Sequence, residues 1–189
     1  MRFILASGSQ RRVELLSAAG FDFDVIPANV DETPRPDEPP REYALRVARD
    51  KAAHVAALEQ TPGRIVLAAD TVVVAAGRLM GKPKDRDDAE SMLRLLSGAI
   101  HDVHTAVVVQ RGNQRLDRVV TTRVEFQPLT ADELAWYLQS GEPEGKAGGY
   151  GIQGRAARFI DRIEGSWSNV VGLPISTVYR LLAEVGAGN

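Results

Sequence analysis

Near its amino end the chain reads Phe3-Ile4-Leu5-Ala6-Ser7-Gly8-Ser9-Gln10-Arg11-Arg12-Val13-Glu14-Leu15-Leu16. The first residues are apolar and predict a short buried strand, while Ser7-Gly8-Ser9 predicts a tight turn. From Arg11 onward apolar residues repeat at helical spacing until Gly20, which predicts a helix that ends there. The turn therefore leads directly into the amino end of a helix.

The start of this predicted helix carries an unusual charge, because two arginines occupy its first turn. The amino end of a helix already has a partial positive charge and unpaired N–H groups, so Arg11 and Arg12 lie on the unfavourable side of the dipole. Together with the hydroxyls of Ser7 and Ser9 they predict an anion site, most simply a phosphate site. The alternative is that Ser9 is an ordinary N-cap and that both arginines are solvated.

The composition is that of a globular protein without a basic surface field. The chain has 189 residues, 44% of them hydrophobic, which suits a single domain over 1–189 or two lobes that share one core. Lysine and arginine number 23 against 25 acidic residues, for a net charge of -2. This balance does not favour a polyanion, so we expect no nucleic-acid partner.

Cysteine usage and the amino-terminal segment bear on location. Cysteine is absent, which excludes disulfides and thiolate metal sites and fits a reducing compartment. The first apolar run ends at Ala6, too short for a signal-peptide core or a membrane span. We therefore expect a cytoplasmic protein that does not associate with membranes.

An acidic, proline-rich loop follows a second predicted strand, Phe21–Ile26. It carries Asp31, Glu32, Asp37 and Glu38. Loops of this composition are usually solvated linkers, and we interpret Asp37 and Glu38 in that way. Such loops can also present carboxylates to a divalent cation, so Glu32 is a candidate metal ligand if an anion site lies nearby.

Two charged residues fall at positions where the pattern predicts burial. Lys51 lies on the apolar stripe of a helix predicted for Arg41–Leu58, and Asp70 interrupts an apolar strand predicted for Arg64–Val74. Lys51 either extends its ammonium to water or points it at a buried anion. A buried carboxylate needs a cation, hydrogen-bond donors or a shifted pKa, so Asp70 is our candidate for a general-base or metal-assisted role. The alternative is a structural aspartate held by backbone donors.

The middle of the chain predicts scaffold. The turn Gly81-Lys82-Pro83 carries a single lysine, and a turn near position 112 joins two alternating strands as an antiparallel hairpin. Helix-capping pairs are expected at Asp85 with Asp88 and at Thr130 with Glu133. A final helix is expected after Pro174.

Three polar residues, His101, Asp102 and His104, could suggest a metal cluster. They lie at the start of a predicted strand over 103–109. Strand alternation puts Asp102 and His104 on one face and His101 on the other. We therefore interpret them as structural or hydrogen-bonding residues.

Glycine is concentrated in the segment Glu142-Pro143-Glu144-Gly145-Lys146-Ala147-Gly148-Gly149-Tyr150-Gly151-Ile152-Gln153-Gly154. Its five glycines let the backbone approach a ligand, Lys146 offers charge, and Gln153 offers a donor and an acceptor. Residues 149–154 match G-x-G-x-x-G, but a loop precedes them and a strand-like segment follows, so the dinucleotide fingerprint fails on context. A plain flexible loop is the alternative.

Several of these segments, taken in order, resemble the Maf family of nucleoside triphosphate pyrophosphatases. The matching blocks are Leu5-Ala6-Ser7-Gly8-Ser9-Gln10-Arg11-Arg12, Lys51-Ala52, Ala69-Asp70-Thr71-Val72-Val73, Gly81-Lys82-Pro83, Lys146-Ala147-Gly148-Gly149-Tyr150-Gly151-Ile152-Gln153-Gly154 and Val171-Gly172-Leu173-Pro174. They extend over nearly the whole chain. The resemblance implies a single α/β unit with a long, mixed, twisted sheet, helices on both faces and two lobes around a cleft, similar to the inosine triphosphatase fold.

The resemblance also implies an activity. Family members hydrolyse a nucleoside triphosphate between the α and β phosphates, with a divalent cation, Mg²⁺ or Mn²⁺. Members similar to this chain at Arg12, Thr71 and Gln153 prefer dTTP and UTP, and by that analogy these residues select the base and Asp70 accepts a proton. A sister group that acts on 7-methyl-GTP differs at those positions. The family has also been linked to septum formation, so a non-catalytic regulator of cell division is the competing hypothesis.

The residues themselves are compatible with that chemistry. We expect Ser7, Ser9, Arg11, Lys51 and Lys82 to bind the triphosphate, and Glu32 with Asp70 to hold a metal ion or activate water. No Walker A lysine motif is present, which disfavours a motor or kinase built on that loop. Whether the protein forms a homodimer is left open.

Overall fold

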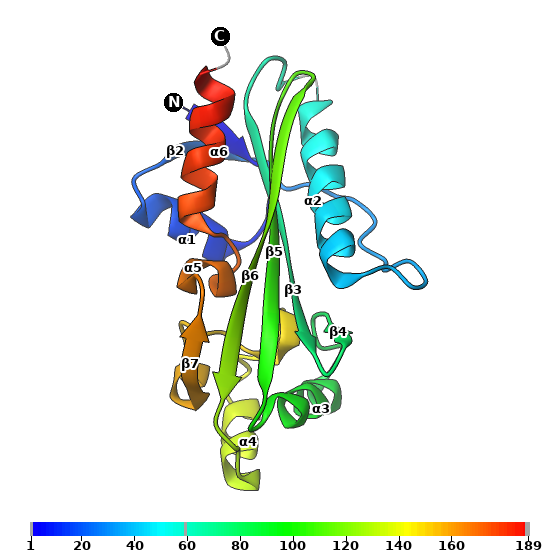
Figure 1. The fold of residues 1–189 in the computed structure, drawn as a ribbon, viewed down its shortest axis with the longest axis vertical. Coiled ribbons are helices and arrows are strands. Elements are labelled where there is room, and N and C mark those ends of the chain that lie inside the picture. The colour runs from blue at the N-terminus through cyan, green and yellow to red at the C-terminus, as the bar shows by residue number, and fades with distance from the viewer. Residues whose placement is uncertain (1, 59, 188–189) are drawn as a thin grey trace. The chain divides into compact units, whose positions relative to one another are not determined.

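The computed structural model describes residues 2–58 and 60–187 and has a mixed α/β fold (Figure 1). Its sheet has seven strands in the order β2-β1-β3-β5-β6-β7, with β4 paired to β3. The strands are β1 (Arg2–Leu5), β2 (Asp22–Val25), β3 (Val66–Ala75), β4 (Arg78–Met80), β5 (Ile100–Arg111), β6 (Gln114–Phe126) and β7 (Ile160–Glu164). The helices are α1 (Gln10–Ala18), α2 (Pro40–Ala56), α3 (Arg86–Leu96), α4 (Ala131–Leu138), α5 (Trp167–Val171) and α6 (Ile175–Ala187), with short 3-10 helices η1 (Ala147–Gly149) and η2 (Arg155–Phe159). The expected α/β class with a mixed sheet is confirmed.

The chain divides into two compact units, each built from separate segments. The first unit comprises Met1–Thr71, Thr105–Val120 and Gly172–Asn189. The second comprises Val72–His104 and Thr121–Val171. Strands β3, β5 and β6 contribute residues to both units.

In the first unit, β2 and β3 lie on opposite sides of β1 in the sheet. Strand β1 pairs in parallel with β2, with Phe3 opposite Phe23, and with β3, with Leu5 opposite Leu67. The two crossovers run in opposite directions, so right-handed connections put α1 and α2 on opposite faces. Figure 1 shows α2 and α6 on opposite sides of the sheet. The carboxyl end of β1 is therefore a topological switch point, the place where open α/β sheets bind ligands.

The core of the first unit explains why these segments pair. Strand β1 is buried on both faces, and the inner stripes of α2 and α6 are apolar. Side chains without measurable exposure include Phe3, Ile4, Leu5, Leu16, Val47, Val55, Leu67, Val178 and Val185. Helix α2 begins at Pro40, one residue earlier than expected, because proline at the first helical position loses no intrahelical hydrogen bond.

The second unit contains a strand and an α-helix that the sequence pattern did not predict. Strand β4 forms an antiparallel hairpin with β3 through Ala76 and Gly77, which have φ of 48° and 73°. Tight hairpin turns need positive φ at both central residues, and alanine gives no such signal in a sequence. The second element, α5, holds Asn169, whose amide donates to Val103 O and Thr122 Oγ1, both at 3.0 Å.

The predicted helix caps in the second unit are confirmed. Asp85 Oδ1 accepts from the Asp88 amide at 2.8 Å and begins α3. Thr130 and Glu133 form a reciprocal capping box at the start of α4. These bonds pair backbone donors that a helix start otherwise leaves free.

The two histidines near the start of β5 make the hydrogen bonds expected of structural residues. His104 Nδ1 lies 2.9 Å from Thr121 Oγ1, and His101 Nε2 lies 2.7 Å from the Tyr150 hydroxyl. His101 also packs edge-on against Phe126 and Tyr150. The buried ring connects β5 to the glycine-rich segment.

His101 predicts a loss of stability at mildly acidic pH. Burial lowers its pKa to about 4, so between pH 6.5 and 4 the unfolded chain binds a proton that the folded chain does not. The contribution of His101 to the free energy of unfolding is therefore fully present above about pH 6.5, and about 3 kcal/mol of it is lost as the pH drops to about 4. Urea unfolding across this range should show a smaller decline in His101→Gln, whereas the exposed His54→Gln control should follow wild type. Equal declines in all three proteins would contradict the assignment.

Candidate functional site

The candidate site of the first unit begins where β1 ends. The Ala6 amide still donates to Leu67 O at 2.8 Å, so β1 stays paired with β3 up to the turn. Ser7 is buried, and its Oγ accepts from the Ser9 amide at 3.2 Å, which closes the turn before α1. The turn thus lies at the switch point between β1 and β3.

Arg12 is fixed by protein acceptors on three sides. Its Nε donates to Gly172 O at 2.9 Å, one terminal nitrogen donates to Ser7 Oγ at 3.0 Å and the other to Thr71 Oγ1 at 3.2 Å. The residue is buried, with 8% of its surface exposed. Arg12 therefore ties the turn, strand β3 and Gly172, which directly follows α5, together, and the sequence-based alternative of a solvated Arg12 is wrong.

The Thr71 hydroxyl is the centre of this network. It accepts from Arg12, lies 2.9 Å from Thr105 Oγ1 and can donate to Gly172 O at 3.3 Å. A hydroxyl has one proton and two lone pairs, so donation to Gly172 leaves Thr71 to accept from both Arg12 and Thr105. This arrangement uses the full hydrogen-bonding capacity of the hydroxyl.

The amino end of α1 lacks the usual neutralising groups. Ser9 occupies the N-cap position, but its side chain makes no capping hydrogen bond, and the first turn contains no acidic residue. Arg11, in that turn, is half-buried. Ser9 is therefore not the ordinary side-chain cap of the alternative interpretation, and the helix start suits an anion.

A second cluster pairs Lys51 of α2 with two carboxylates. Lys51 Nζ lies 2.8 Å from Asp70 Oδ1 and 2.8 Å from Glu32 Oε1. Lys51 and Asp70 are both buried, at 8% and 7% exposure, whereas the Glu32 side chain is 44% exposed. The buried anion that Lys51 required is thus Asp70, and the cation that Asp70 required is Lys51. The alternative of an aspartate held by backbone donors does not describe this contact.

The two clusters influence each other electrostatically. Burial raises the pKa of Asp70, while the charge and hydrogen bond of Lys51 and the charge of Arg12 oppose that shift. Burial likewise lowers the pKa of Arg12, and Asp70 is the main opposing influence. Burial also raises the pKa of Tyr43 to about 12, and its hydroxyl donates to Glu32 O at 2.7 Å. A carboxyl with a raised pKa beside two cations is the kind of group that accepts a proton in catalysis.

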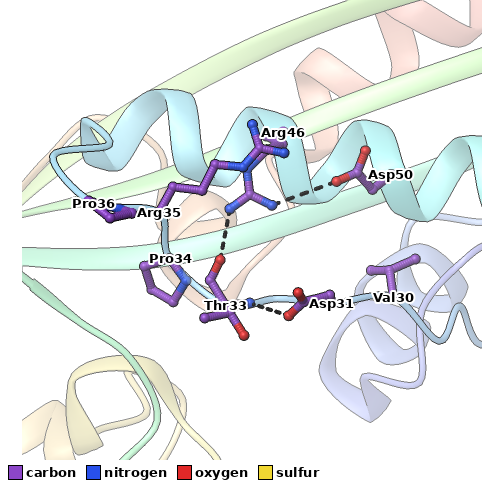
Figure 2. A pocket seen from close by; sticks show the side chains of 8 residues that line it. All are labelled: Val30, Asp31, Thr33, Pro34, Arg35, Pro36, Arg46 and Asp50. Carbon is purple, nitrogen blue, oxygen red and sulfur yellow. Dashed lines mark hydrogen bonds and ion pairs between the residues drawn. The ribbon is translucent and has the colours of Figure 1, made fainter.

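Arg46 of α2 anchors the acidic loop that carries Glu32. Its guanidinium binds both oxygens of Glu38, at 2.6 and 2.8 Å, and donates to Thr33 O at 3.1 Å. Figure 2 shows Arg46 between the loop and Asp50. Both residues line a pocket of 390 Å³. Arg46 lowers the pKa of Glu38 to about 2. Glu38, interpreted from the sequence as part of a solvated linker, is instead a loop anchor.

The remaining predicted site residues, Lys82 and Gln153, belong to the second unit. Both are exposed. Their segments are joined, because the Gly148 amide donates to Gly81 O at 3.0 Å. Gly148 also packs against Val73, and with φ of 71° a Cβ there would lie 3.1 Å from the valine side chain. The glycine-rich segment is therefore packed against its own unit, which does not describe the plain flexible loop of the alternative interpretation.

The structure thus joins Ser7, Arg12 and Thr71 directly and groups Glu32, Lys51 and Asp70. Sequence reasoning missed Thr105, the Gly172 carbonyl and Arg46. Gly172 alone gave a signal, as part of the Val171–Pro174 block, and its φ of 125° explains the need for glycine. Among residues 2–58 and 60–187, no group of three or more His, Cys, Asp or Glu side chains is arranged to hold a metal ion.

The fold and site define an α/β protein that gathers cations and the start of a helix at the switch point of its sheet, beside the buried carboxyl of Asp70. The chain belongs to the Maf family, because the family model described as Maf-like protein matches residues 2–185.

Curated relatives match nearly the whole chain. A dTTP/UTP pyrophosphatase from Anaeromyxobacter dehalogenans (strain 2CP-1) is 50% identical over 189 residues, covering 98% of this chain and 94% of its own. The proteins of the same name from Geobacter sulfurreducens and Vibrio parahaemolyticus are 48% and 47% identical, covering 98% and 97% of this chain and 97% of each relative. Among solved structures, a Vibrio cholerae protein matches with 12% identity and a TM-score of 0.40, over 74% of this chain and 73% of its own.

Proposed function

We propose that this protein hydrolyses dTTP and UTP to the nucleoside monophosphate and pyrophosphate. The observation that carries the proposal is the buried Asp70 beside the cationic turn at the switch point of the sheet. Full-length relatives at 47–50% identity that are named dTTP/UTP pyrophosphatase supply the substrate class.

Binding of the triphosphate would use the groups that begin α1. The start of the helix, the hydroxyls of Ser7 and Ser9 and the guanidinium of Arg11 offer donors and positive charge to phosphate oxygens. Lys51 and Lys82 would add positive charge. Fixed donors of this kind stabilise the charge that develops on phosphoryl oxygens during transfer, which is the main catalytic contribution in such reactions.

The chemical step would use Asp70 as the proton acceptor. Water forms a new P–O bond with the α phosphorus. The bond between the α phosphorus and the α–β bridging oxygen breaks, and pyrophosphate leaves with the bonding electrons. Asp70 takes the proton from the attacking water. Burial prepares it for this role by raising its pKa, and Lys51 keeps it anchored at 2.8 Å.

We propose that Glu32 and Asp70 hold a divalent cation, Mg²⁺ or Mn²⁺. Their carboxylates approach the same Lys51 ammonium, so both already face one positive charge. Hard cations prefer carboxylate and phosphate oxygens, and Mg²⁺ usually takes only one or two carboxylates together with substrate phosphates. When bound, the cation would neutralise phosphate charge.

We propose, from the resemblance to the family, that Arg12, Thr71 and Gln153 select the base. Because Arg12 donates to Ser7, Thr71 and Gly172, we expect it to act by holding Thr71 in place. Gln153 is exposed and offers an amide that can donate and accept.

We propose that the enzyme is cytoplasmic, because the absence of cysteine is compatible with a reducing compartment. Among residues 2–58 and 60–187, no helix has the length and apolar character needed to cross a membrane. The absence of a nucleic-acid partner stays a prediction.

A substrate panel tests the proposed function. The purified protein is assayed with dTTP, UTP, dCTP, GTP and 7-methyl-GTP in Mg²⁺ or Mn²⁺, and released pyrophosphate and orthophosphate are measured separately. We expect pyrophosphate from dTTP and UTP, with kcat/KM at least about tenfold above that for the other substrates, since one well-placed hydrogen bond supplies that factor. Orthophosphate as the product, or preference for 7-methyl-GTP, would reject the proposal.

A further inference from the structure

Glu142, the first residue of the glycine-rich segment, binds with its carboxylate the backbone that directly follows the other end of the segment. Glu142 Oε2 accepts from the Arg155 amide at 2.8 Å, and Oε1 accepts from the Ala156 amide at 3.5 Å. Both amides lie in the first turn of η2, directly after Gln153 and Gly154. A charged acceptor makes stronger hydrogen bonds to such amides than a neutral one.

Tyr137 completes the anchor on the other side of Gln153. Its hydroxyl donates to Glu142 Oε1 at 3.0 Å and accepts from the Gly151 amide at 3.3 Å. The ring has no measurable exposure and packs edge-on against Phe159, with 5.6 Å between centroids. Burial first, and then the charge of Glu142, raises the pKa of Tyr137, so the phenol stays a neutral donor.

The backbone of Glu142 is itself fixed. Its amide donates to Ser140 Oγ at 3.1 Å, and Ser140 Oγ donates to Tyr137 O at 2.6 Å. Lys146 Nζ donates to the Glu142 carbonyl. The carboxylate therefore projects from a rigid turn that closes α4.

Gly154 lets the carboxylate reach the segment. A Cβ at position 154 would lie closer to the Glu142 carboxylate atoms than non-bonded atoms can pack. A side chain at position 154 would therefore displace the carboxylate of Glu142.

We propose that Glu142 and Tyr137 are positioning residues for base selection, because they hold the backbone on both sides of Gln153. The inference rests on the proposed function, in which Gln153 reads the base. Gln153 is exposed between the buried residues Ile152 and Ala156, so the anchored backbone sets where its amide points. Nothing in the sequence motif assigns Glu142 or Tyr137 a part in selecting the substrate.

The main test compares dTTP with dCTP, which share sugar and triphosphate and differ at the edge of the base. Glu142→Gln keeps the size of the side chain but replaces one acceptor oxygen with an NH₂ group, so either Arg155 N or Tyr137 loses its acceptor. We expect the ratio of kcat/KM for dTTP over dCTP to fall about tenfold, mainly through a higher KM for dTTP. The ratio does not depend on how much of the protein is folded, because both substrates meet the same enzyme.

Three further variants make the test specific. Tyr137→Phe keeps the packed ring and should lower the ratio by a smaller factor, about threefold, because the direct bonds from Glu142 remain. Gly154→Ala should lower the ratio as Glu142→Gln does, by displacing the carboxylate. Glu144→Gln, an exposed residue of the same turn, is the matched control and should keep the wild-type ratio.

Amide hydrogen exchange, followed by NMR without nucleotide, gives a readout that does not depend on activity. Exchange at Gly151 and Arg155 should be faster in Glu142→Gln than in Glu144→Gln, about tenfold. Faster exchange with a lower ratio supports the inference. An unchanged ratio in Glu142→Gln and Gly154→Ala, or a changed ratio with unchanged exchange, overturns it. Failure of the wild-type enzyme to hydrolyse dTTP would instead reject the proposed function.

Discussion

Asp70→Asn is expected to lower kcat for dTTP by about 10²–10⁴-fold while nucleotide binding is retained. Asparagine has nearly the same shape and can still accept from Lys51, but it cannot take a proton from water. The two properties are measured separately: turnover by pyrophosphate release, and binding by calorimetry with a dTTP analogue whose α–β bridge is a methylene group. If Asp70 is the proton acceptor, the dissociation constant of the analogue should be unchanged while turnover is lost.

The control for this variant is Asp22→Asn on β2. The Asp22 side chain is 71% exposed and lies 3.6 Å from Arg2, a surface pair that contributes little. It should leave both turnover and binding unchanged. If Asp70→Asn also kept full activity, Asp70 would have no part in the chemistry and its pairing with Lys51 would be structural only.

Arg12→Lys is expected to lower the free energy of unfolding by about 2–4 kcal/mol. The lysine ammonium is a single point of contact, so it can serve at most one or two of the acceptors Ser7 Oγ, Thr71 Oγ1 and Gly172 O while it stays buried with its charge. Urea unfolding at neutral pH measures the change.

The matched substitution is Arg2→Lys in β1. The Arg2 side chain is 59% exposed and its ion pair with Asp24 faces solvent, so we expect a change within about 0.5 kcal/mol. A loss below about 1 kcal/mol for Arg12→Lys would mean that its three hydrogen bonds do not hold the turn, β3 and Gly172 together.

Local patterns predicted most of the regular elements, and the exceptions have physical reasons. The strand and helix around the first turn, the capped starts of α3 and α4 and the apolar strand β3 follow from periodicity and capping chemistry alone. Strand β4 was missed because its turn uses alanine at positive φ. Helix α5 is only five residues long, too short for helical periodicity to register.

The sequence predicted which residues of the candidate site require a charged partner, but not which partner each one has. A buried aspartate must have a cation, and a lysine on an apolar stripe must have an anion or a route to water, so Asp70 and Lys51 could both be selected from the sequence. That each satisfies the other could not, because 19 residues and a crossover separate them. The same holds for Arg46 and Glu38, where the sequence pattern indicated only a solvated linker.

Sequence alone determined that Lys51 and Asp70 carry charge into apolar surroundings, because burial of a charge is costly and the hydrophobic pattern reveals where burial occurs. Tertiary structure alone decided the partners. Arg12 donates to the carbonyl of Gly172, 160 positions away, and Glu142 holds amides on the far side of Gln153. Hydrogen bonds of this kind depend on distances of a few ångströms between segments that the chain brings together only after it has folded.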